Sequence, residues 1–134
     1  MNVRIPKNTK TRIGDPGDIY AIMQKVLLRQ NKMHRSKEYF WTIGLNTKND
    51  ISYIELLAIG GLNKVAIDPV ELFHLAVSKK CKRIILVHNH PSGDLTPSKN
   101  DLEFTLQMKK ASELLKIQIL DHLIITETEY RSII

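Results

Sequence analysis

The feature that most constrains this chain is a turn-rich loop that follows an apolar run and carries two histidines. The run Ile84-Ile85-Leu86-Val87 is rich in β-branched residues and has basic residues before it, which is typical of a buried strand. Side chains two apart on a strand share a face, so His88 and His90 are expected to point the same way. Residues that break a strand and turn the chain follow at once: Pro91, Gly93 and Pro97.

A helix is predicted from Ser98 to Lys116, because apolar side chains recur there at roughly helical spacing. Ser98 and Asp101 lie three apart, so both are expected near one face of its first turn. Two histidines at a strand end and one carboxylate on the next helix make three ligands with an open fourth position, the layout of a catalytic zinc site. The alternative is that Ser98 and Asp101 only cap the helix, although a cap and a ligand can coexist.

The whole string resembles the JAMM (MPN-plus) metalloprotease signature, in which His-x-His-Pro, six residues and Ser-x-x-Asp follow one another. It is more similar still to the RadC-like (UPF0758-type) branch, whose loop typically reads His-Asn-His-Pro-Ser-Gly-Asp with Thr-Pro-Ser after it. The segment Asp121-His122-Leu123-Ile124-Ile125 also resembles that branch, and the likeness covers about residues 18–134. It implies an α/β fold, a single JAMM/MPN-type (cytidine-deaminase-like) domain with a mixed β-sheet flanked by helices.

Composition narrows the class of protein. A chain of 134 residues with 43% hydrophobic residues fits one globular domain, and no apolar run approaches the roughly 20 residues of a membrane helix. Cys81 has no other cysteine to pair with, so we expect it to be a thiol in the core. The N-terminus lacks the apolar stretch of a secretory signal, and together these points favour a cytoplasmic location. The formal charge is +6, and residues 1–14 are expected to form a flexible basic tail that could contact nucleic acid weakly.

The remaining elements follow from periodicity and turn residues, and together they predict a domain over 15–134. They are a helix over 19–30, a hairpin of strands 38–45 and 51–59, a short strand over 65–67 and a helix from Asp68-Pro69. After these come the strand at 84–87, the helix at 98–116, a strand in which 117–120 leads through Asp121-His122 into 123–126, and a final strand around 130–134. The site then falls beyond the carboxyl end of the central strand, where open α/β sheets usually bind ligands.

Hydrolysis of an amide also needs a base, and a glutamate outside the ligand set suits that role. In JAMM enzymes the base follows the first helix and opens the next strand, so the resemblance favours Glu38. Glu55 is the alternative, although its place in the hairpin suggests an outward, solvated side chain. The resemblance also implies that Ser98 helps to hold the oxyanion, and His122 is interpreted as structural or as a partner of a ligand.

Three functions are therefore open. The first is a zinc-dependent metallopeptidase-type hydrolase of amide or isopeptide bonds, with Zn²⁺ on His88, His90 and Asp101, catalytic Glu38 and Ser98, and a protein or peptide substrate. The second is a DNA-associated, repair-linked protein or metal-dependent nuclease. Longer RadC-like members carry an N-terminal helix-hairpin-helix region, which we do not expect here. The third is a metal-stabilised interaction module without catalysis. No membrane partner is expected.

Overall fold

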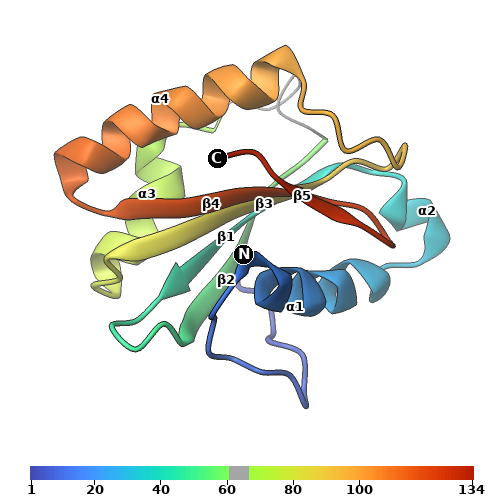
Figure 1. Cartoon of the computed structure of the whole chain (residues 1–134), viewed down its shortest axis with the longest axis horizontal. Coiled ribbons are helices and arrows are strands. Elements are labelled where there is room, and N and C mark those ends of the chain that lie inside the picture. Colours follow the sequence, from blue (N-terminus) through green and yellow to red (C-terminus); the bar gives the residue numbers. More distant parts are fainter. Residues whose placement is uncertain (61–66) are drawn as a thin grey trace.

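The protein is a mixed α/β domain, seen in a computed structural model that describes residues 1–60 and 67–134 (Figure 1). The expected strand over 65–67 therefore lies almost wholly outside the described residues. One five-stranded sheet has the order β2-β1-β3-β4-β5, with β3 and β4 parallel and the other neighbours antiparallel. The strands are β1 (Tyr39–Leu45), β2 (Ile51–Ile59), β3 (Arg83–Asn89), β4 (Gln118–Ile125) and β5 (Tyr130–Ser132). The predicted fold class and hairpin are thus confirmed.

The helices begin where the sequence supplies capping residues. They are α1 (Pro16–Leu28), α2 (Lys32–Arg35), α3 (Pro69–Ser78) and α4 (Lys99–Leu115). Asp15 caps α1 with a capping box, Asp68 caps α3, and both are followed by Pro, whose missing N–H and fixed φ suit the first helical position. The single turn of α2 was not predicted, because its residues lie in a basic connector without an apolar face.

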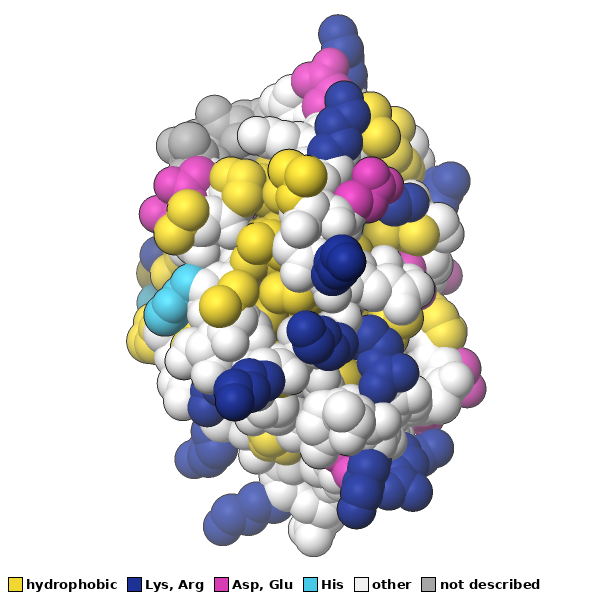
Figure 2. Space-filling model, turned by 90° about the vertical axis from the view of Figure 1, so that its left-hand side faces the viewer, with side chains coloured by type: hydrophobic (Ala, Val, Ile, Leu, Met, Phe, Trp, Pro, Cys, Tyr) yellow, Lys and Arg dark blue, Asp and Glu magenta, His cyan; other side chains and the backbone are white. Residues whose placement is uncertain are grey.

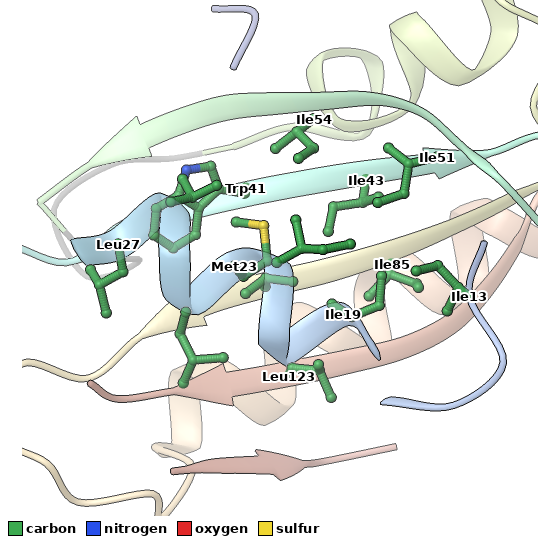
Figure 3. Packing of buried hydrophobic residues seen from close by; sticks show 14 of the residues in the cluster. Ile13, Ile19, Met23, Leu27, Trp41, Ile43, Ile51, Ile54, Ile85 and Leu123 are labelled. Carbon is green, nitrogen blue, oxygen red and sulfur yellow. The ribbon is translucent and has the colours of Figure 1, made fainter. Parts of the chain in front are cut away.

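The sheet is covered on both faces, so the protein has three layers (Figure 1). On one face α1 packs against the strands, and Figure 3 shows Ile19 and Met23 of α1 pointing toward Ile43 and Ile85 of the sheet. On the other face α3 and α4 cover a second apolar cluster that includes Phe73, Leu86 and Met108. The buried Cys81 lies in this second cluster, as expected for a core thiol.

The N-terminal segment lies along the edge of β2, and the expectation of a flexible tail over 1–14 is wrong here. The amide of Val3 donates to the carbonyl of Ile54 at 2.8 Å, and the amide of Leu56 donates to the carbonyl of Met1 at 2.9 Å. An edge strand presents a row of unpaired backbone groups, which a neighbouring segment can satisfy. Charge alone did not reveal that this basic segment would pair with the sheet.

The surface at the end of the sheet where β3 begins is rich in basic residues, and Figure 2 shows many Lys and Arg side chains on this side of the molecule. Exposed lysines here precede β3 or end α4: Lys79, Lys80, Lys82 and Lys116. This cluster lies at the opposite end of β3 from His88.

Among the described residues, no helix is long and apolar enough to cross a membrane.

Candidate metal centre

The candidate site lies where β3 ends and α4 begins. His88 is the sixth residue of β3. His90 follows the strand and still pairs with β4, since its amide donates to the carbonyl of Ile125 at 3.0 Å. Because the histidines are two positions apart, both rings reach the same side of the sheet, as predicted. The loop then turns at Gly93, whose φ of 85° favours glycine, and returns the chain to the first turn of α4, where Asp101 lies.

Three ligand atoms converge in this place. Nε2 of His88 lies 3.1 Å from Nε2 of His90. Oδ2 of Asp101 lies 3.3 Å from Nε2 of His88 and 3.2 Å from Nε2 of His90. A tetrahedral zinc ion with bonds of about 2.0–2.1 Å keeps its ligand atoms roughly 3.3 Å apart. The three observed separations therefore fit a single zinc-sized ion, and the donor types suit zinc.

Asp101 is both a cap and a candidate ligand, so the two interpretations of Ser98-x-x-Asp101 coexist. The backbone N–H of Ser98 donates to Oδ2 of Asp101 at 2.8 Å, and the N–H of Asp101 donates to Oγ of Ser98 at 3.0 Å. This reciprocal capping box fixes the carboxylate in the direction of the histidines. In this bond Ser98 acts through its oxygen, so its hydroxyl hydrogen is not used by it.

The two candidate bases lie in very different places. Oε1 of Glu38 is 3.8 Å from Nε2 of His90, and the side chain is 36% exposed, so it can reach a molecule bound at the site. Glu55 is on β2 and its carboxylate lies 3.8 Å from the N-terminal ammonium of Met1. The expectation that Glu55 is solvated is wrong, since the residue is only 8% exposed beneath the N-terminal segment.

The electrostatics of the site follow from the same contacts. The hydrogen bond with Asp101 raises the pKa of His90, although burial opposes it. Burial alone would raise the pKa of Asp101, but the rings of His88 and His90, which donate to the carboxylate when they are protonated, outweigh it and hold that pKa well below its usual range. Asp101 is therefore ionised, and it attracts a cation to the point where the ring nitrogens meet.

A third histidine stands behind the ligands. Nε2 of the fully buried His122 lies 2.8 Å from Nδ1 of His88, which agrees with the interpretation of His122 as a partner of a ligand. Its Nδ1 lies 2.6 Å from Oγ1 of Thr105 on α4. Burial lowers the pKa of His122 well below its ordinary value, so this ring is neutral. Phe40 lies against both rings, stacked on His88 and edge-on to His122.

Thr105 is the residue of this centre that sequence reasoning missed. It lies one helical turn beyond Asp101, and a threonine in a helix has no motif that distinguishes it from a core residue. Its spacing of four from Asp101, on the same helix face, is the only signal that could have found it. His34 and His74 are exposed and lie on α2 and α3, outside the group that could hold a metal.

Two clefts meet at His90 and give the site access to solvent. One is lined by side chains around the loop: Glu38, His90, Pro91, Ser92, Asp94 and Thr96. The other extends past Asn89 toward Arg35 of α2 and Glu127, which form an ion pair with each other. The two clefts share His90, Pro91 and Ser92.

The fold and site thus define an α/β domain in which two histidines and an aspartate could hold a metal ion. A family model described as "RadC-like JAB domain" matches residues 13–134. The chain belongs to this family, as the sequence resemblance implied.

Curated relatives support the assignment. A UPF0758 protein of Carboxydothermus hydrogenoformans is 42% identical over 118 residues, which are 88% of this chain and 50% of the relative. A UPF0758 protein of Staphylococcus haemolyticus is 40% identical over 127 residues, or 95% of this chain and 54% of the relative. One from Caldanaerobacter subterraneus is 46% identical over 99 residues, or 74% and 42%. The chain spans about half the length of these relatives, and their names state no activity.

Proposed function

We propose that this protein is a zinc-dependent metallopeptidase-type hydrolase that cleaves an amide or isopeptide bond in a peptide or protein. The observation that supports this proposal is the convergence of Nε2 of His88, Nε2 of His90 and Oδ2 of Asp101 within 3.1–3.3 Å of one another. Three protein ligands leave one position of a tetrahedral ion open, which is typical of catalytic rather than structural zinc. The same ligand set could serve other hydrolyses, so the bond cleaved is the part to be tested.

Zinc, when bound, would polarise the carbonyl of the substrate and lower the pKa of a water molecule to about 7. Glu38 supports the proton transfers in this proposal. Its carboxylate lies beside His90 and remains accessible from the cleft, so it can accept a proton from water and return it to the leaving nitrogen. Glu55 is less suited, because β2 and the N-terminal segment enclose it.

Ser98 has the second catalytic role. It stands at the start of α4 with its oxygen accepting from the amide of Asp101, so the hydroxyl hydrogen can be donated to an oxyanion. Its attachment to the capping box holds this donor at a fixed distance from the ligand carboxylate. Positioned donors of this kind stabilise charge as it develops in the transition state.

The test compares Glu38→Gln with Glu103→Gln, a matched control on α4 whose carboxylate pairs only with Lys99 among the described residues. Both variants and the unaltered protein are loaded with zinc and incubated with a peptide library, ubiquitin-like conjugates, and single- and double-stranded DNA. We expect amide cleavage by the unaltered protein and Glu103→Gln, and a loss of about 10²–10⁴-fold in Glu38→Gln with zinc retained.

Other outcomes would overturn the proposal. If every amide substrate stayed intact while DNA was cleaved in a manner that required His88 and His90, the nuclease function would replace it. If zinc bound fully but no substrate of either class were cleaved, the domain would be a metal-stabilised interaction module. An active Glu38→Gln beside an inactive Glu55→Gln would move the base to β2.

A further inference from the structure

We propose that Thr105 and His122 are positioning residues that fix the tautomer of His88 and so keep its Nε2 free of a proton and available to a metal ion. The inference rests on the proposed metal site and extends it to residues that do not touch the ion. It follows from which group donates and which accepts in each hydrogen bond of a buried series. That series of hydrogen bonds links the backbone of α4 to the candidate ligand on β3.

The series consists of three contacts. The hydroxyl of Thr105 lies 2.8 Å from the backbone carbonyl oxygen of Asp101, one helical turn earlier. The same hydroxyl lies 2.6 Å from Nδ1 of His122. Nε2 of His122 then lies 2.8 Å from Nδ1 of His88. Thr105 and His122 are 6% and 0% exposed, so these protein groups rather than bulk water must satisfy one another.

The number of hydrogens that each group carries determines which group donates in each contact. A threonine hydroxyl has one hydrogen and a carbonyl oxygen can only accept, so both of its contacts are hydrogen bonds only if the hydroxyl donates to the carbonyl of Asp101. Its oxygen must then accept from Nδ1–H of His122. A neutral imidazole carries its single proton on one nitrogen, which leaves Nε2 of His122 as an acceptor. Nδ1–H of His88 therefore donates to it, and Nε2 of His88 is left unprotonated.

The reverse direction would have the opposite effect on the site. If the hydroxyl of Thr105 donated to Nδ1 of His122, the proton of that ring would move to Nε2 and donate to His88. The proton of His88 would then occupy its Nε2, which faces His90 and Asp101. A protonated nitrogen cannot bind a metal ion. Thr105 thus decides between a competent and an incompetent ligand set.

His90 shows why His88 needs this device. Nδ1 of His90 lies 2.7 Å from the backbone carbonyl of Asp94, which can only accept, so its tautomer is fixed directly. Partners of this kind commonly orient metal-binding histidines. The partner of His88 is instead another imidazole, which can donate or accept. A further residue has to fix the direction, and Thr105 is in the position to do so.

The direct test is nuclear magnetic resonance of metal-free protein with ¹⁵N-labelled histidine, recorded over a series of pH values so that the neutral form of each ring is observed. Long-range ¹H–¹⁵N correlations distinguish a protonated from an unprotonated ring nitrogen. We expect His88 and His122 both to carry the proton on Nδ1. A proton on Nε2 of His88 in this protein would overturn the proposal.

The second test is zinc affinity of three α4 variants. Thr105→Val keeps the shape but removes the hydroxyl, Thr105→Ser restores it, and Ser112→Ala removes another buried hydroxyl that donates to a carbonyl of the same helix. We expect Thr105→Val to weaken zinc binding about 10–100-fold and to shift the ring-nitrogen signals, while Thr105→Ser and Ser112→Ala stay near the unaltered protein.

A folded Thr105→Val with unaltered zinc affinity and unaltered ring-nitrogen signals would contradict the proposal. If the variant does not fold, the proposal is tested by the histidine spectrum of the unaltered protein. The two proposals can also fail separately. Zinc binding with the expected tautomers but without hydrolysis would refute the proposed function alone. The opposite tautomer in a zinc-binding, active protein would refute this inference alone.

Discussion

The two faces of the sheet differ in what their buried side chains need. The face under α1 is filled by apolar residues such as Met23, Ile43 and Ile85, which need only to be removed from water. The face under α3 and α4 also buries polar side chains of the strands and of α4: Thr42, Glu55, His88, Asp101, Thr105 and His122. Buried polar groups are costly unless each finds a partner, so this face depends on specific directions and not only on volume.

The difference separates an apolar face from the face that carries the candidate metal site. Near α4 the polar groups form a connected chain from Thr105 through His122 to His88. On the same face near β2, buried oxygens of Thr42 and Glu55 have no hydrogen-bond partner among the residues that the structure describes. The first group ends at His88, which belongs to the cluster that could hold a metal ion, so variants on the two faces should fail in different ways.

The largest effect is expected from Asp101→Asn. The amide can still cap α4 but carries no charge, so the site loses the anion that attracts the cation. Zinc affinity should fall more than about 100-fold, beyond the loss expected for a partner outside the ligand set, and hydrolysis should be lost with it. Competition titration against a chelator checks the affinity, and unchanged binding would remove Asp101 from the ligand set.

Ile43→Ala tests the other face. Ile43 is 0% exposed beneath α1, and truncation of such a side chain leaves a cavity. The free energy of unfolding should fall by about 2–5 kcal/mol, while zinc affinity of the folded protein should stay the same. Denaturant unfolding and zinc titration of one preparation check both. A loss of zinc affinity comparable to that of Asp101→Asn would show that the two faces are not separable.

Ser98→Ala should affect turnover more than folding. Loss of one oxyanion donor typically lowers turnover by about 10²–10³-fold, and loss of the cap costs about 1 kcal/mol of stability. Zinc content should be nearly unchanged, because Ser98 is not a ligand. Turnover is measured well below the unfolding temperature. Unaltered turnover with reduced stability would make Ser98 a cap only.

The smallest effect is expected from Asp15→Ala, which removes the equivalent cap from the helix on the apolar face. Asp15 accepts from the amide of Gly17 at 2.7 Å and forms a capping box with Asp18. Stability should fall by about 1 kcal/mol, with no change in zinc affinity or turnover. This variant is the control for Ser98→Ala, since both lose a helix cap but only one lies at the site. Impaired turnover in Asp15→Ala would contradict that contrast.

The features that could be predicted from the sequence are those set by residues close together in the chain. His88, His90 and Asp101 could be placed together because a strand, a turn-rich loop and a capped helix are all local features. The surroundings of Glu55 could not be predicted, since its burial depends on Met1, 54 positions away in the chain. Thr105 was missed for a similar reason, because its importance comes from His122 on a different strand.

The central claim is that the polar face converges on one metal ion. The most direct measurement is zinc content by elemental analysis, paired with X-ray absorption at the zinc edge, on the unaltered protein and on His88→Ala/His90→Ala. We expect about one equivalent of zinc, with imidazole nitrogen and carboxylate oxygen ligands at about 2.0–2.2 Å, and little zinc in the double variant. Full zinc occupancy in the double variant, or an unaltered protein that takes up no zinc, would contradict the claim.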